Sequence, residues 1–102
     1  MADTLAQRIV RRRNELGMGS NELARVIGKS HGFMTQLNNG DGRPSEDTLR
    51  AILRSLDVPR AEHDAWFASA GVIPQAMVDA LLAHPEAWAR VRAMLMTEVE
   101  RG

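Results

Sequence analysis

Apolar residues along the chain recur with the spacing of α-helices and not with the alternation of β-strands. Near the N-terminus Leu5, Ile9 and Leu16 fall on one helical face. Glycine and proline separate each helical run from the next, and no segment alternates apolar and polar residues as a half-buried strand does. The pattern therefore predicts an all-α protein.

Seven short helices are expected from these runs. They cover residues 4–16, 20–27, 31–38, 45–56, 60–70, 74–83 and 85–101. Asp3, Ser30 and Ser45 are the predicted N-caps, because a short side-chain oxygen can accept a hydrogen bond from a free amide of the first turn. Gly17 and Gly28 stand where the first two helices should end.

Residues 20–39 predict two short helices joined by a tight turn. Ala24 is small enough to let the two helices cross closely, and Gly28 can take a left-handed backbone in the turn. Four apolar residues of this segment are expected to face the rest of the domain: Leu23, Ile27, Met34 and Leu37. These matched positions, all within twenty residues, are typical of a helix-turn-helix motif.

Composition and charge fit this picture. The chain has 102 residues, of which 44% are hydrophobic, and this suits a single globular domain. The formal net charge is zero, but residues 1–60 hold ten Lys and Arg against seven Asp and Glu. Residues 61–102 hold three against six. A basic front half can steer one face toward phosphate even in a neutral chain.

The sequence argues against several other functions. The chain has no cysteine, so disulfides and thiolate metal sites are excluded. His63 and His84 lack neighbours at metal-ligand spacing, and there is no nucleophile motif or phosphate-cradling glycine loop. We therefore expect a protein without catalytic residues, metal or cofactor. We also expect it to be cytoplasmic and not associated with a membrane, since it has no apolar run of signal or spanning length.

A set of short motifs extends beyond the two-helix unit. They are Glu22-Leu23-Ala24, Gly28 and Ser30, Leu37-Asn38-Asn39-Gly40, Arg43-Pro44-Ser45, and Thr48-Leu49 with Ile52. With these motifs the chain resembles the phage-repressor and Cro-like, or XRE-type, helix-turn-helix regulators. The resemblance implies a lambda-repressor-like DNA-binding domain of about five short helices at residues 1–71, with its motif at 20–39. Two additional helices would form a C-terminal extension at 72–102.

The resemblance also implies residue roles. The third helix would lie in the major groove, and its base-contacting residues would be Ser30, His31, Gly32, Thr35 and Gln36. Gln36 can pair with adenine through two hydrogen bonds, and Thr35 can contact a thymine methyl group. The phosphate-contacting residues would be Ser20, Lys29, Asn39, Arg43 and Arg12. Arg11 and Arg13 would add positive charge near this face, and Arg13 would hydrogen-bond to Asn38.

The C-terminal extension leaves two possibilities open. Its apolar stripe must be buried, either by folding back on the first and fifth helices or against a second subunit. We expect a homodimer whose interface contains Trp66, Phe67, Trp88, Val91 and Leu95. The function expected is a sequence-specific regulator of double-stranded DNA, a repressor on a palindromic operator. The alternative is an antitoxin or adaptor whose C-terminal helices clasp another protein, such as a toxin or regulator.

Overall fold

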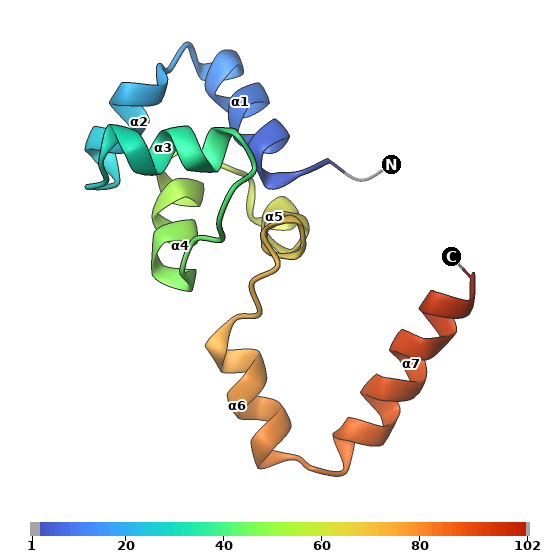
Figure 1. Cartoon of the computed structure of the whole chain (residues 1–102). Helices are drawn as coiled ribbons and strands as arrows, with labels where there is room; N and C mark the ends of the chain where they lie inside the picture. Colours follow the sequence, from blue (N-terminus) through green and yellow to red (C-terminus); the bar gives the residue numbers. More distant parts are fainter. Residues whose placement is uncertain (1–2, 102) are drawn as a thin grey trace.

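The computed structural model describes residues 3–101, and all regular elements in that range are helical (Figure 1). The helices are α1 (Leu5–Leu16), α2 (Ser20–Val26), α3 (His31–Asn38), α4 (Glu46–Ser55), α5 (His63–Ala70), α6 (Gln75–Ala83) and α7 (Ala87–Arg101). A 3₁₀ turn, Arg60–Glu62, precedes α5. The structure thus confirms the all-α prediction and the order of seven helices.

The N-terminal cap of α1 differs from the sequence prediction. Thr4, not Asp3, is the N-cap: its hydroxyl accepts from the Gln7 amide at 3.1 Å, and Gln7 Oε1 accepts from the Thr4 amide at 2.8 Å. This reciprocal pair satisfies two free donors at once, which a lone Asp3 cannot do. Asp3 instead forms an ion pair with Arg11 at 2.7 Å. This pair lowers the pKa of the Asp3 carboxyl, mainly through the Arg11 hydrogen bond.

Helices α1 to α5 enclose a single apolar core. Each contributes buried side chains, and the largest fully buried ones are Ile9, Leu23, Met34, Leu49, Ile52, Leu53 and Leu56. Trp66 and Phe67 of α5 also belong to the core, and their side chains are 3% and 5% exposed. Burial of this apolar surface is the main stabilising contribution that holds five short helices together, because helices of 7 to 12 residues are marginal in isolation.

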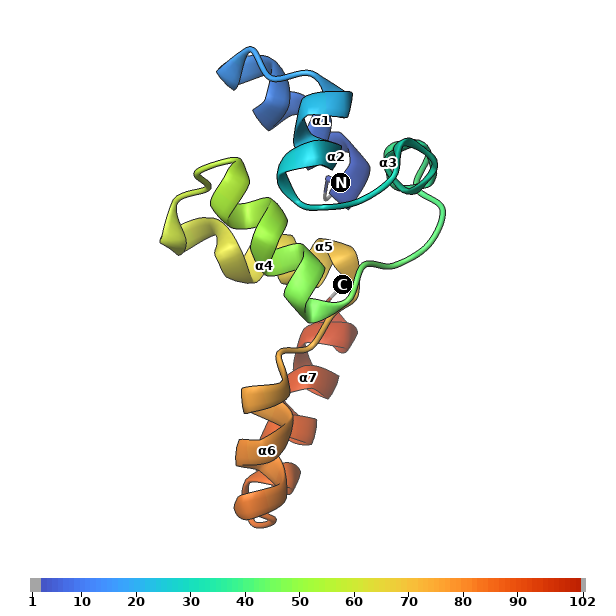
Figure 2. The same cartoon turned by 90° about the vertical axis from the view of Figure 1, so that its left-hand side faces the viewer.

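Helix α3 lies at the margin of this five-helix body. In Figure 1 it runs across the front of α2 and α4, and in Figure 2 it is seen end-on at the edge of the domain. Its inner side rests on α1 and α2, while its outer side faces away from the other helices. The fold therefore presents one long face of α3 to solvent.

Helices α6 and α7 extend away from the five-helix body. α7 returns from the end of α6 at an open angle, so the two helices form a V (Figure 1). Neither contains a fully buried residue. The radius of gyration is 15.7 Å, whereas a compact chain of this length has about 13 Å. The extension thus leaves apolar residues such as Ile73, Leu82 and Val99 largely exposed.

Within residues 3–101 no single helix has the length and hydropathy needed to cross a bilayer. One pair, Arg60–Ala70 with Gln75–Ala83, reaches that length and composition only across an 86° bend.

One carboxylate ties the start of α6 to α4. Glu46 Oε1 accepts a hydrogen bond of 2.7 Å from the Gln75 amide, and Glu46 Oε2 accepts from Arg50 at 2.9 and 3.0 Å. These bonds lower the pKa of Glu46, and the bond from the Gln75 amide makes the largest contribution. A carboxylate here also suits the positive end of the α6 dipole. Glu46 therefore acts as the N-terminal cap that the α6 sequence itself lacks.

We predict that E46A speeds hydrogen exchange of the Gln75 amide severalfold, because the variant removes its acceptor. In the wild type the protection of this amide, measured against its intrinsic exchange rate at each pH, should fall on acidification. Since the folded-state pKa of Glu46 lies below its ordinary value of 4.5, its contribution is present above that value and is lost as the pH falls through the lowered pKa. D47A is the matched control, because Asp47 lies in the same turn of α4 and is exposed. Equal exchange of the Gln75 amide in E46A and wild type would contradict the conclusion that Glu46 ties the start of α6 to α4.

Candidate nucleic-acid interface

Helix α3 has two distinct faces. Met34 and Leu37 point into the core, while His31, Thr35 and Gln36 are exposed. Ser30 begins the helix as predicted: its hydroxyl accepts from the Phe33 amide at 3.1 Å. The outer face carries uncharged groups that can donate and accept hydrogen bonds, as amide and hydroxyl side chains do at base edges.

The turn before α3 fixes its position relative to α2. Gly28 adopts φ +72°, and the amide of Lys29 donates to Ala24 O at 2.8 Å, which closes the end of α2. Ala24 is buried between the helices. The roles predicted for Ala24 and Gly28 are both confirmed by this geometry. The turn braces α3 on its predecessor with no large side chain between them.

The exposed polar groups of α3 are partly pre-oriented. His31 Nδ1 lies 2.7 Å from Asn21 Oδ1 of α2. With that oxygen as acceptor, Nδ1 is the donor of this bond, and Nε2 has no partner within the described chain. Thr35 Oγ1 donates to His31 O at 3.1 Å, so its oxygen can still accept and its methyl group remains on the surface. Gln36 is exposed beside them.

Asn21 was missed by the sequence prediction. It lies in the first turn of α2, and its side chain contacts the first residue of α3. Its exposure and its hydrogen bond to His31 make it part of the same polar surface. The available signal was a polar residue next to Ser20 at the start of the motif. Its pairing with His31 depends on the helix crossing, which the sequence pattern does not specify.

Three of the predicted phosphate contacts surround this surface. Lys29 is exposed in the turn, with its Nζ 5.5 Å from the centroid of the Phe33 ring. Asn39 is the exposed C-cap of α3. Ser20 is half-buried, and its hydroxyl accepts from Asn38 Nδ2 at 3.0 Å. These residues lie at both ends of α3, where a groove-bound helix meets the two phosphate backbones.

Arg12 stabilises the fold by bonding within the chain, and this corrects the prediction that it contacts a phosphate. Its Nε and Nη2 donate to Leu56 O and Asp57 O, each at 2.9 Å, and its Nη1 pairs with Glu15. Arg12 therefore caps backbone carbonyl groups at the C-terminal end of α4. It lines a hollow with Pro59 and Trp66, to which α3 contributes no residue.

The neighbouring arginines are also engaged elsewhere. Arg11 pairs with Asp3, and Arg13 Nη1 donates to Met18 O at 3.2 Å. The predicted bond between Arg13 and Asn38 is replaced, since the Asn38 amide group donates to Ser20. The three consecutive arginines are thus all bonded to groups of the described chain outside α3, although exposed Arg11 lines a hollow with Asn38 of α3.

Arg43 is exposed but lies over the end of α5. A methyl group built on Gly71 would be 3.1 Å from both Nε and Nη2 of Arg43. The guanidinium therefore covers the C-terminal end of α5, where a cation is favourable. A phosphate contact by Arg43 would require this side chain to turn away from Gly71.

The five predicted dimer-interface residues divide into two groups. Trp66 and Phe67 belong to the core, so the prediction that they contact a second subunit is wrong. The ring of Phe67 is also covered by Arg50, 5.0 Å from its centroid. Trp88 and Leu95 of α7 are 48% and 58% exposed, and Val91 is half-buried. Only the α7 residues remain available for an interface.

Two carboxylates lie near the outer face of α3, which itself contains no Asp, Glu, Lys or Arg. Glu22 follows Asn21 in α2, and Asp41 lies in the turn after α3, where its amide donates to Gln36 O at 2.8 Å and it lines a hollow with Gln36. Among residues 3–101 no three His, Asp or Glu side chains gather closely enough to hold a metal ion. The arrangement can therefore offer hydrogen bonds to a polar ligand with cations near its margin.

We predict opposite stability effects for two glycine substitutions in this region. G28A should lower the free energy of unfolding by about 1 kcal/mol, because alanine is strained in a left-handed backbone. G32A should raise it by up to about 1 kcal/mol, since alanine favours the helix and only Ser30 Oγ, at 3.8 Å, lies near the new methyl group. Urea unfolding followed by tryptophan fluorescence measures both. Equal effects in the two variants would show that the turn geometry is wrong.

Comparison with known proteins gives one match. The family model described as a helix-turn-helix domain matches residues 4–66, which is more than half of the chain. No curated protein and no solved structure matches the sequence. The matched segment begins at the N-cap of α1 and ends within α5, and it contains every residue of the polar surface on α2 and α3.

Proposed function

The chain belongs to the helix-turn-helix domain family, and on this basis we propose that it is a sequence-specific regulator of the phage-repressor and Cro-like type that binds double-stranded DNA. Residues 1–71 form the DNA-binding domain, and residues 72–102 form a dimerisation extension. The protein represses by occupying its operator and works in the cytoplasm without catalysis. The observation that carries the proposal is the exposed, uncharged polar face of α3 above a buried apolar face.

The chemistry of this face supports direct contact with bases. The amide of Gln36 can pair with adenine, and His31 Nε2 and Thr35 can accept hydrogen bonds or contact a thymine methyl group. Ser30 and Gly32 lie at the start of the helix, and the lack of a side chain at Gly32 would let the backbone approach the groove closely. Lys29, Asn39 and Ser20 fix the register through phosphates. Asn21 joins the set because it orients His31.

A two-fold dimer would suit this binding mode. One short recognition helix offers only a few base contacts, and paired half-sites about 34 Å apart double them. The exposed apolar residues of α7 support this part of the proposal. A homodimer predicts a palindromic operator.

A second candidate function also draws on the C-terminal helices. Exposed Met77, Leu82 and Met94 favour contact with another protein, as in an antitoxin or adaptor. A stoichiometric protein partner, together with no measurable affinity for DNA at low salt, would favour this function over the regulator. Purification from the native cell with a tag on the N-terminus, followed by a DNA titration of the same sample, compares the two directly.

We predict that Q36A weakens binding to a selected operator by about 1–3 kcal/mol, which corresponds to roughly 5- to 150-fold, and relaxes base preference at one position. The reason is the loss of a two-pronged contact to a single base. K29A should weaken binding to all sequences alike and reduce the slope of log affinity against log salt by about 1, because one phosphate contact is lost. Fluorescence anisotropy with labelled duplexes at several salt concentrations measures both effects.

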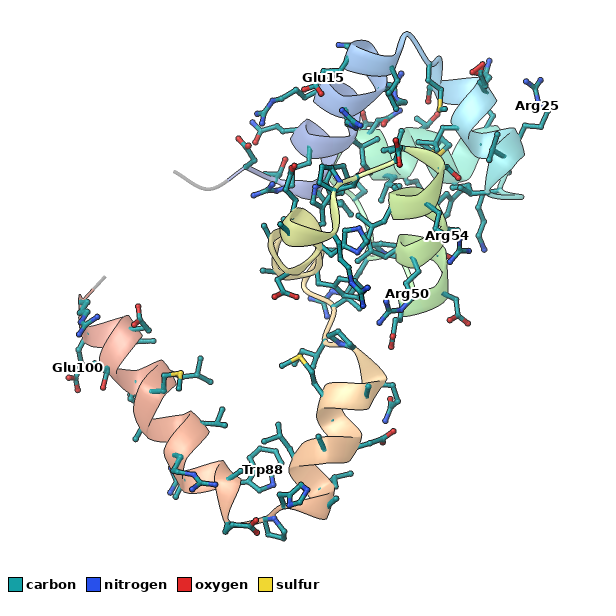
Figure 3. All side chains as sticks on the ribbon, turned by 180° about the vertical axis from the view of Figure 1, so that it is seen from behind. Glu15, Arg25, Arg50, Arg54, Trp88 and Glu100 are labelled. Carbon is teal, nitrogen blue, oxygen red and sulfur yellow. The ribbon has the colours of Figure 1, made fainter. Side chains whose placement is uncertain are left out.

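R54A is the matched control for charge. Arg54 is exposed near the end of α4, a helix without predicted DNA contacts (Figure 3). Its substitution should leave the base preference unchanged. If Q36A binds every duplex as the wild type does, α3 does not read bases. If the wild type shows no binding even at low salt, the regulator proposal fails.

A further inference from the structure

One hydrogen bond joins the first residue of α3 to the helix before it. His31 Nδ1 lies 2.7 Å from Asn21 Oδ1, and both residues are exposed on the surface proposed to bind DNA. The second ring nitrogen of His31, Nε2, has no partner within the described chain. Because the ring is rigid, the bond to Asn21 fixes its plane and directs Nε2 away from Asn21. Nε2 is thus the ring nitrogen that is left to meet a base.

The acceptor at Nδ1 determines which ring nitrogen carries a proton. A carbonyl oxygen can only accept, so Nδ1 is the donor of this bond in either charge state of the ring. A neutral imidazole has one N–H group, and with that group at Nδ1 the other nitrogen, Nε2, is an acceptor. In the protonated ring both nitrogens are donors. Asn21 therefore makes Nε2 change from acceptor to donor when the ring gains a proton.

This change of role alters which base the ring can pair with. In the major groove cytosine presents a donor, its N4 amino group, whereas guanine presents acceptors at N7 and O6. A neutral His31 can accept from cytosine, and a protonated His31 can donate to guanine. Each form leaves polar groups unsatisfied against the other base, which costs more than a typical hydrogen bond contributes. Histidine is also the side chain that ordinarily changes its charge near neutral pH.

Charged side chains lie near the His31–Asn21 pair without bonding to it. Glu22 and Arg25 belong to α2, and Lys29 precedes α3 in the turn; all three are exposed. Arg25 extends outward from α2 (Figure 3). None of the ion pairs among residues 3–101 includes these three residues or His31. The charge of the ring therefore responds to the pH and to bound phosphates and not to a fixed ionic partner.

Helix α1 also packs on α3, and its arginines have partners away from His31. Arg8 and Arg12 line a hollow to which α3 contributes no residue, Arg11 pairs with Asp3, and Arg13 donates to Met18 O. The N-terminal end of α3 disfavours a cation at its first residue, whereas the phosphates of a bound duplex favour one. DNA binding and protonation of the ring are therefore linked, and each affects the other.

We propose that His31 reads one base pair in a pH-dependent manner and that Asn21 is the positioning residue that gives it this property. The inference rests on the proposed function, the binding of duplex DNA by α3, and specifies one contact of that complex. With a neutral ring the protein prefers cytosine at the base that His31 faces. With a protonated ring it prefers guanine there. The pH then selects between operators that differ at this position.

NMR of the ring nitrogens in the ¹⁵N-labelled full chain tests the role of Asn21 without DNA. At about pH 8 His31 should be protonated at Nδ1 and unprotonated at Nε2. N21A should move the proton toward Nε2, because the acceptor is lost. N21D should restore the wild-type pattern, since its carboxylate also accepts from Nδ1. H31A assigns the signals. A neutral wild-type ring with its proton on Nε2 would overturn the proposal, because the Asn21 side chain would then be the donor.

Fluorescence anisotropy tests the base preference itself. An operator selected from random duplexes is changed to C·G or G·C at each position in turn, and affinities are measured at about pH 8 and about pH 5.5. At one position the ratio of affinity for cytosine to affinity for guanine should fall by about tenfold on acidification. H31A should abolish this change. N21A should lose the cytosine preference at the higher pH and keep the guanine preference at the lower pH.

H84A is the matched control, because His84 is a second exposed histidine but lies at the end of α6. It should behave as the wild type does, and circular dichroism verifies that each variant is folded at both pH values. A preference that is the same at both pH values, or a change that H84A removes, would contradict this inference and leave the regulator proposal intact. No binding to any duplex at low salt would overturn the regulator proposal and the base preference together.

Discussion

The structure depends on the burial of one face of an eight-residue helix. Helix α3 is too short to persist alone, because the cost of forming its first turn is recovered only over a longer helix. Met34 and Leu37 insert into the core and supply the missing stabilisation. The same burial fixes the rotation of α3, so the residues between them along the helix must point outward. The exposed polar face is thus a consequence of the core.

Small residues and backbone hydrogen bonds set how α2 and α3 pack together, and this packing determines the polar surface that the two helices expose. Ala24 lets α2 approach α3, and the left-handed Gly28 turns the chain within one residue. As a result Asn21 reaches His31 across the motif. The side chains that meet a ligand first are therefore oriented before it arrives, which reduces the ordering cost of binding. Arg12, which could have contributed charge, instead joins α1 to the end of α4.

The sequence predicted the elements well because periodicity and caps are local. Ser30 and Ser45 were identified as N-caps, and the seven helices lie close to the predicted ranges. The roles of Trp66 and Arg12 were not predictable in the same way. An apolar stripe is equally consistent with burial within a chain or between chains, and Trp66 is in the core because α5 packs against α1. Arg12 finds its acceptors 44 and 45 residues away, a contact that no local pattern encodes.

An NMR titration tests the central claim, that the outer face of α3 binds duplex DNA, most directly. Amide and side-chain resonances of the labelled full chain are followed as a duplex is added at low salt. The account predicts that the largest changes occur between Lys29 and Gln36, including the side-chain amide of Gln36, with smaller changes at Asn21 and Asn39. Changes confined to α6 and α7, or an unchanged spectrum of α3 at saturating DNA, would contradict it.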